Sequence, residues 1–237
     1  MKNKIFAVAK TNCRNIKPSY IITAIIIGAV FAQDAVMFIL AATGVYRMPA
    51  GNMTTSFGNY FFVLLIHSAV YIPLLNFRRM TNLGAKRSDF NKGCFLAYAV
   101  MAAAISLLSL ILYHTYDRYA ISVFLRSGTM DVIYWFRWIE NGAAVAFFQL
   151  FAFLFLLAVF IHTLVSAQDK WYGWVADVII VAIISVFTPI APLRAALVWF
   201  FNLIIFNQYA FLQIAACLVL AAALFPLNKV ILARKAI

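Results

Sequence analysis

The side chains best suited to chemistry lie inside long apolar stretches of the sequence. Gln33 and Asp34 are adjacent in one apolar run, His67 lies in the next, and His162 and Asp177 lie in two later runs. Counted at about 1.5 Å per helical residue, Asp34 matches His67 in depth, and His162 matches Asp177. Ionisable groups in hydrocarbon are costly and usually face partners or water. The sequence therefore predicts two polar pairs, which either line a translocation path or clasp helices together.

The chain lacks the short motifs that usually bind nucleotides, metals or acyl groups. None of the patterns G-x-x-x-x-G-K-[ST], H-E-x-x-H, C-x-x-C and G-x-S-x-G occurs. The three histidines (His67, His114 and His162) fall on separate segments. We therefore expect no catalytic activity of this chain by itself, no metal site and no bound cofactor.

The composition restricts the protein to the membrane class. Of 237 residues, 66% are hydrophobic and 11% are charged, and the mean hydropathy is +0.95. Soluble domains are about 45–50% apolar and about 25% charged. A soluble enzyme and a disordered chain are excluded, and three distant cysteines exclude a disulfide-rich secreted domain. We expect an all-α integral membrane protein in which residues 1–237 form a single transmembrane domain.

Apolar runs of about 20 residues predict six membrane-spanning helices. The expected spans are, in order, about 19–43, 59–77, 94–114, 143–166, 174–191 and 208–228. Pro189 and Pro192 interrupt the chain after the fifth span, because proline lacks an N–H donor and clashes with the preceding turn. Segment 193–206 is therefore either a further span or a re-entrant hairpin at the outer face.

The distribution of basic residues favours the hairpin. Lys and Arg concentrate in the cytoplasmic loops of membrane proteins. Six spans place segments 1–18 and 78–92 and the basic C-terminal tail on one side, and these hold most of the 19 Lys and Arg residues. Five arginines fall on the other side: Arg47, Arg118, Arg126, Arg137 and Arg194. We expect both termini in the cytoplasm, and we attribute the net charge of +12 to orientation, not to nucleic-acid binding.

Two segments outside the spans also carry a pattern. Segment 1–18 mixes apolar and basic residues, which is typical of a helix lying on the inner membrane interface. The alternative is a tail that only holds orientation. Segment 115–142 contains Trp135 and Trp138, and aromatic side chains of this kind settle at membrane interfaces. We expect one or two helices on the outer leaflet there, or else a structured loop.

The loop between the second and third spans carries the most specific pattern. Its central part reads Leu83-Gly84-Ala85-Lys86-Arg87-Ser88-Asp89-Phe90, long enough for about two helical turns with Leu83 and Phe90 as apolar anchors. A basic loop usually just fixes orientation. Orientation does not account for a glycine followed by two basic residues, an aspartate and a phenylalanine.

This segment resembles the coupling helix of type-2 ATP-binding-cassette (ABC) exporter permeases. The amphipathic N-terminal helix, the six spans and the outer hairpin between spans five and six resemble that family in layout, and the specific likeness covers about Asn82 to Phe90. Within the family, the size and the missing extracellular domain are most similar to small bacterial permeases for antimicrobial or amphipathic peptides, of the phenol-soluble-modulin exporter type.

The resemblance implies a permease subunit in the bacterial cell membrane that moves an amphipathic peptide or similar hydrophobic substrate outward. A second permease copy or paralogue would pair with it, and two separate ABC ATPase subunits would bind ATP and Mg. The implied coupling residues are Leu83, Gly84, Ala85, Lys86, Arg87, Asp89 and Phe90. The alternative is a non-transporting membrane partner, an immunity protein or a sensor.

Overall fold

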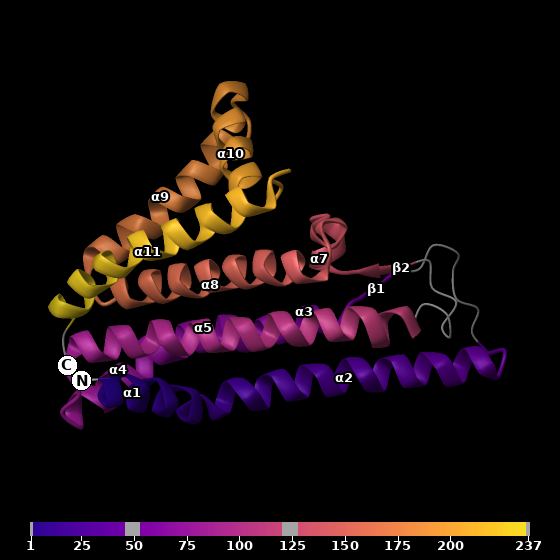
Figure 1. The fold of residues 1–237 in the computed structure, drawn as a ribbon, viewed down its shortest axis with the longest axis horizontal. Coiled ribbons are helices and arrows are strands. Elements are labelled where there is room, and N and C mark those ends of the chain that lie inside the picture. Colours follow the sequence, from indigo (N-terminus) through magenta and orange to yellow (C-terminus); the bar gives the residue numbers. More distant parts are fainter. Residues whose placement is uncertain (1, 46–52, 120–127, 236–237) are drawn as a thin grey trace.

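The computed structural model, which describes residues 2–45, 53–119 and 128–235, consists of long helices lying side by side (Figure 1). Five helical stretches are long and apolar enough to cross a membrane: Lys17–Ala42, Phe57–Asn82, Arg87–Asp117, Ala143–Ala167 and Ala210–Arg234. A bent pair, Trp171–Phe187 with Ala191–Ile204, makes a sixth if it is counted as one span. The chain therefore has the architecture of a multi-pass helical membrane protein.

The described chain is almost entirely helical. In order, the helices are α1 (Lys2–Asn15), α2 (Lys17–Ala42), α3 (Phe57–Tyr71), α4 (Phe77–Asn82), α5 (Arg87–Leu112), α7 (Val132–Trp135), α8 (Ala143–Ala167), α9 (Trp171–Phe187), α10 (Ala191–Ile204) and α11 (Ala210–Arg234). The π-helical turn η1 (Ile72–Asn76) joins α3 to α4, η2 (Tyr113–Asp117) extends α5, and the 3-10 turn η3 (Trp138–Asn141) precedes α8. Strands β1 (Met53–Thr55) and β2 (Gly128–Met130) form a short parallel pair that the sequence did not predict.

The second and third long helices extend further than expected at their connected ends. The second continues to Asn82, and the third begins at Arg87 instead of near residue 94. Asp89 in the first turn of α5 complements the positive end of the helix dipole. Phe90 is fully buried against Phe77, with ring centroids 5.3 Å apart. These contacts stabilise an early helix start, so Ser88 to Phe90 belong to the long helix.

The break between α9 and α10 agrees with the expected chain reversal. α10 is turned by 117° from α9, so it does not continue α9 as a straight span. Pro192 lies in the first turn of α10, where the missing N–H breaks no helical hydrogen bond. At 14 residues, α10 is about 21 Å long and too short to cross a hydrocarbon core of about 30 Å.

Both termini lie at the same end of the helical bundle, beside α1 and α4 (Figure 1). We call the end formed by α1, α4, the start of α5 and the C-terminal tail the basic end, and the other the opposite end. The cytoplasmic location of the basic end remains a prediction from the charge distribution. Arg47 and Arg126, which entered that prediction, lie outside the described residues.

The N-terminal helix is docked on the bundle. Val8 and Ala9 of α1 are buried, and Gly93 of α5 lies directly beneath them. A Cβ added at Gly93 would lie 2.4 Å from Cγ1 of Val8 and 3.2 Å from the backbone N of Ala9. The expected N-terminal helix therefore forms, and one side of it packs against protein, where only membrane interface was expected.

The described part of segment 115–142 packs against the bundle. Ile133 of α7 and Trp138 of η3 are buried, and Trp138 Nε1 donates a 2.9 Å hydrogen bond to the carbonyl of Ile205. Among the described residues of this segment after Tyr119, the expected helical parts are these two short turns. Residues 120–127, within the same segment, lie outside the described residues.

The close approach of α1 to α5 can be tested by substituting Gly93. Gly93→Ala should destabilise the protein by about 1–3 kcal/mol, because the added methyl group forces α1 away from α5. Gly28→Ala is the matched control, because a Cβ at Gly28 would meet nothing within 4 Å. The midpoint of thermal unfolding in detergent should fall for the first variant only. Equal midpoints for both variants would contradict the docked position of α1.

Candidate functional site at the basic end

The connection between α4 and α5 is a tight turn and not a helix. α4 ends at Asn82, and Gly84 has a φ of +83°, which side chains other than glycine rarely adopt. The N–H groups of Gly84 and Ala85 donate to the carbonyls of Thr81 (2.9 Å) and Met80 (2.9 Å). These two bonds close the helix in a Schellman motif. The expected two-turn helix over Leu83 to Phe90 is therefore wrong, because Gly84 terminates one helix and Arg87 begins the next.

The two expected apolar anchors have opposite environments. Leu83 is 83% exposed at the tip of the turn, whereas Phe90 is fully buried between α4 and α5. Lys86 occupies the N-cap position of α5, and Phe90 N–H donates to its carbonyl. Phe90 is therefore not accessible to a partner at the surface. Its contact with Phe77 holds the turn onto the bundle, and only Leu83 offers an exposed apolar contact.

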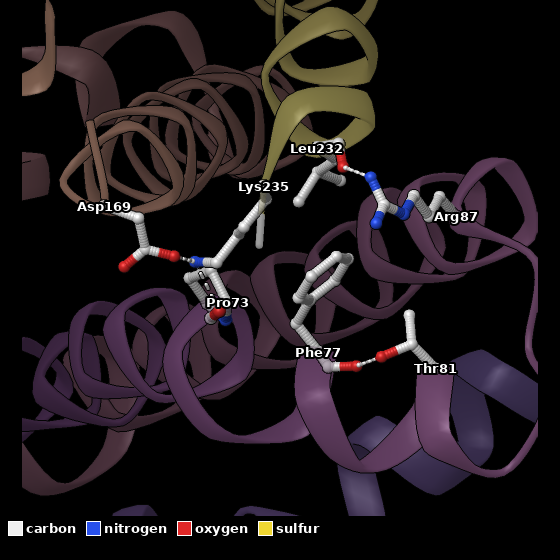
Figure 2. A network of polar contacts seen from close by, with 7 residues as sticks. All are labelled: Pro73, Phe77, Thr81, Arg87, Asp169, Leu232 and Lys235. Atoms are coloured by element: carbon white, nitrogen blue, oxygen red, sulfur yellow. Dashed lines mark hydrogen bonds and ion pairs between the residues drawn. The ribbon is translucent and has the colours of Figure 1, made fainter. Parts of the chain in front are cut away.

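Arg87 links the turn to the end of the last long helix. Its guanidinium donates to the carbonyl of Leu232 at 3.1 Å and also to the carbonyl of Ala233, as Figure 2 shows for Leu232. Carbonyls in the last turn of a helix have no partner within the helix. Arg87 supplies that partner from α5, so the turn and the C-terminal end of α11 are held together.

Lys235 joins three further elements at the same place (Figure 2). Its Nζ lies 3.2 Å from Oδ2 of Asp169, donates a 3.0 Å hydrogen bond to the carbonyl of Pro73, and lies 5.5 Å from the ring centroid of Phe77. Its side chain is only 2% exposed, so the charge depends on these partners. We call Arg87, Lys235, Asp169, Pro73 and Phe77 the basic-end clasp.

The clasp also uses the short α8–α9 connection, residues 168–170. Asp169 binds Lys235, and Gln168 Nε2 donates a 2.7 Å hydrogen bond to Oδ2 of Asp177. Lys170 and Trp171 remain exposed at the surface, Trp171 to 75%. This connection therefore presents Lys170 and Trp171 at the surface of the basic end.

The expected pair of Asp34 and His67 does not form. His67 Nδ1 lies 2.7 Å from Oγ of Ser19, in the first turn of α2. Asp34 is 15 residues further along the same helix, which places it about 22 Å away. Asp34 is buried toward the opposite end, and its neighbour Gln33 is exposed. The estimate that placed Asp34 and His67 at the same depth failed because the start of α2 already lies beside His67, deeper in the bundle than the charge pattern indicated.

The expected pair of His162 and Asp177 does not form either. His162 is fully buried, and its Nδ1 lies 2.7 Å from the hydroxyl oxygen of Tyr98 on α5. Asp177 instead accepts the hydrogen bond from Gln168. The two residues match in depth, but α8 turns His162 toward α5 while α9 diverges from the bundle (Figure 1).

Polar contacts within the bundle involve residues that the sequence analysis did not single out. Gln149 Nε2 donates to Gln213 Oε1 at 2.6 Å, and Gln213 Nε2 donates to the carbonyl of Ile204 at 3.1 Å. Asn228 Nδ2 donates to Oδ1 of Asn91 at 2.7 Å, which joins α11 to α5. Gln149 and Gln213 lie inside apolar runs, which was a visible signal for their contact, whereas Asn91 lies in the segment expected to be a basic loop. Lys235 gave no such signal, because it looked like part of a basic tail.

An apolar groove of about 480 Å³ lies between α2 and α3. Tyr20, Ile27 and Phe31 line it from α2, and Phe61 and Leu64 line it from α3. Its lining is almost wholly apolar, so it suits a hydrocarbon chain or the apolar face of an amphipathic molecule. None of the polar residues expected to line a path borders this groove.

The opposite end is fastened by buried carboxylates. Ser56 Oγ donates a 2.5 Å hydrogen bond to Oδ2 of Asp117, and Ser56 N–H donates to the carbonyl of Met130. Asp131 caps α7 by accepting a 2.7 Å hydrogen bond from Ile133 N–H. Burial raises the pKa of the Asp131 carboxyl, and the hydrogen bonds that this carboxyl accepts partly offset the rise. Within the described residues, no group of three or more His, Cys, Asp or Glu could hold a metal ion.

The basic-end clasp can be tested by a double-mutant cycle on Lys235 and Asp169. Lys235→Met and Asp169→Asn should each lower the free energy of unfolding, because each leaves a partly buried charge without its partner. The double variant should lose less than the sum of the two, with a coupling energy of about 0.5–3 kcal/mol. Denaturant titration in detergent measures all four proteins. Additive losses would show that the two residues do not interact.

Comparisons with known proteins give no relative for this chain. No protein-family model matches its sequence, and no curated protein and no solved structure matches it. A functional proposal for the chain therefore depends on its own residues and geometry.

Proposed function

We propose that this chain is the membrane-spanning subunit of an ATP-driven exporter of the type-2 ABC class. It would move an amphipathic peptide or similar hydrophobic substrate outward across a bacterial cell membrane. The chain supplies the helices, and a second copy or paralogue completes the pathway. Two separate ATPase subunits bind ATP and Mg and dock at the basic end.

The observation that carries this proposal is the turn at Leu83. The Leu83 side chain lies at the tip of a rigid turn and is 83% exposed, and it suits insertion into a groove of a soluble partner. The turn is short, closed by two backbone hydrogen bonds, and tied by Arg87 to the end of α11. A displacement of Leu83 would therefore reach α4, α5 and α11 together.

The coupling element in this proposal differs from the one expected from the sequence. The contact is the turn from Leu83 to Lys86, with Leu83 as the inserted residue and Lys86 beside it at the surface. Arg87 and Phe90 transmit force inside the protein and do not touch the partner. Trp171 and Lys170 on the neighbouring connection provide a second, smaller contact.

The proposed substrate class follows from the groove between α2 and α3. Its apolar lining suits the hydrophobic face of an amphipathic peptide, and its two phenylalanines and one tyrosine offer adaptable contact area. α2 is exposed along most of its length, so the second permease subunit can close the groove from outside.

The alternative is a membrane protein that transports nothing and only binds another membrane subunit, such as an immunity or sensor protein. The exposed helices α2 and α9 would serve that role equally well. The turn that carries Leu83 is tied to two long helices and so gives an ATPase a mechanical route into the bundle, which is why we prefer the exporter.

The exporter proposal predicts that Leu83 is needed for an ATPase to bind. Leu83→Asp should weaken co-purification of a nucleotide-binding subunit from the native membrane by about ten-fold or more, since burial of one leucine contributes about 1.5–3 kcal/mol. The same variant should fold normally, because residue 83 is exposed. Affinity purification followed by mass spectrometry and an ATP hydrolysis assay measures the effect.

Leu83→Met is the matched control, because it keeps an apolar side chain of similar volume and should retain the partner. If the wild-type chain brings down no nucleotide-binding protein, the exporter proposal is wrong and the structural or sensor function is favoured. If Leu83→Asp retains the ATPase in full, the partner docks elsewhere and the assigned contact is wrong.

A further inference from the structure

A hollow of about 570 Å³ lies where α10 ends and α11 begins. Three aromatic residues (Trp199, Phe206 and Tyr209), three amide residues (Asn202, Asn207 and Gln208) and two leucines line it. Among the described residues, those lining the hollow include no charged side chain. Trp199 and Tyr209 are 67% and 74% exposed, so their rings are accessible to a ligand.

The backbone around the hollow is held by buried side chains from other parts of the fold. Gln213 and Cys217 both donate to the carbonyl of Ile204, and Trp138 Nε1 donates to the carbonyl of Ile205. Gln213 and Trp138 are almost completely buried. The reversal between α10 and α11 is therefore rigid, and the side chains it presents are positioned before any ligand arrives.

The amides are free to bind a ligand. Asn207 Oδ1 accepts the 2.8 Å hydrogen bond from Tyr209 N–H, which shapes the turn and leaves its Nδ2 available. Asn202 and Gln208 are exposed. Each free amide group offers a donor and an acceptor. Aromatic rings beside uncharged donors and acceptors favour a ligand that is polar but uncharged.

The length of α11 places the hollow at the level of lipid head groups. α11 starts at Ala210 and runs 25 residues to the basic end, a rise of about 37 Å, which exceeds a hydrocarbon core of about 30 Å. The start of α11 therefore reaches the interface on the opposite side. Trp and Tyr are typical of that depth.

We propose that this hollow binds the uncharged sugar head group of a glycolipid in the leaflet at the opposite end. The rings of Trp199 and Tyr209 cover the apolar faces of the sugar, and Asn202, Asn207 and Gln208 exchange hydrogen bonds with its hydroxyl groups. Leu203 and Leu212, which also line the hollow, meet the start of the acyl chains. This binding needs no ATPase and does not depend on the exporter proposal.

The experiment uses the full chain, delipidated in lauryldimethylamine oxide, a detergent without a sugar head group. Native mass spectrometry measures binding of monoglucosyl diacylglycerol, phosphatidylcholine and phosphatidylglycerol with identical acyl chains. The glucosyl lipid should bind at least about five-fold more tightly than either phospholipid, the factor expected for one net hydrogen bond. Excess dodecyl maltoside should displace it.

Asn202→Leu combined with Gln208→Leu should abolish the preference for the glucosyl lipid without affecting folding, because both side chains are exposed. Gln33→Leu, the same change at an exposed amide on α2, should leave the preference intact. Equal affinity for the three lipids, preference for phosphatidylglycerol, no displacement by the maltoside, or an unchanged preference in the double variant would each overturn the proposal. Displacement of the lipid by an amphipathic peptide but not by the maltoside would overturn it and indicate a peptide site.

Discussion

The arrangement of the helices depends on one constraint, that polar groups buried in hydrocarbon must find partners within the protein. Gln149, Gln213 and the carbonyl of Ile204 form one chain of hydrogen bonds, which joins α8, α11 and the end of α10. Asn91 with Asn228 joins α5 to α11. Because each bond requires particular side chains to face one another, these bonds determine how α5, α8 and α11 are rotated about their axes.

The same constraint separates a central part of the protein from a peripheral part. α5, α8 and α11 bury many side chains and share several polar contacts, whereas α2 and α9 are exposed along most of their length. Ser19 of α2 contacts His67 of α3, and Asp177 near the start of α9 contacts Gln168. Within the exporter proposal, the peripheral helices are those free to meet a second permease subunit or to move against the central ones.

The two ends of the bundle are held together by different kinds of contact. At the basic end, ionic and carbonyl contacts of Arg87 and Lys235 hold several helix ends together, and Leu83 and Trp171 are left exposed. At the opposite end, the buried hydroxyl of Ser56 and the carboxylate of Asp117 fasten the start of α3, while Trp138 and Gln213 hold the reversal after α10. The first arrangement suits a protein partner, and the second leaves a rigid, uncharged hollow that suits a lipid head group.

The membrane class, the approximate limits of the long helices and the reversal after Pro189 follow from the sequence by itself, because apolar run length and proline chemistry are local properties. The termination of α4 at Gly84 is also local, although the sequence analysis favoured a helix there. Which polar residues meet could not be predicted from depth alone, because pairing depends on helix rotation and on where each helix begins. His67 therefore faces Ser19, and His162 faces Tyr98. Only the tertiary structure buries Phe90 and Lys235, because Phe90 meets Phe77 of the neighbouring helix and Lys235 meets Pro73 and Asp169, which are far away along the chain.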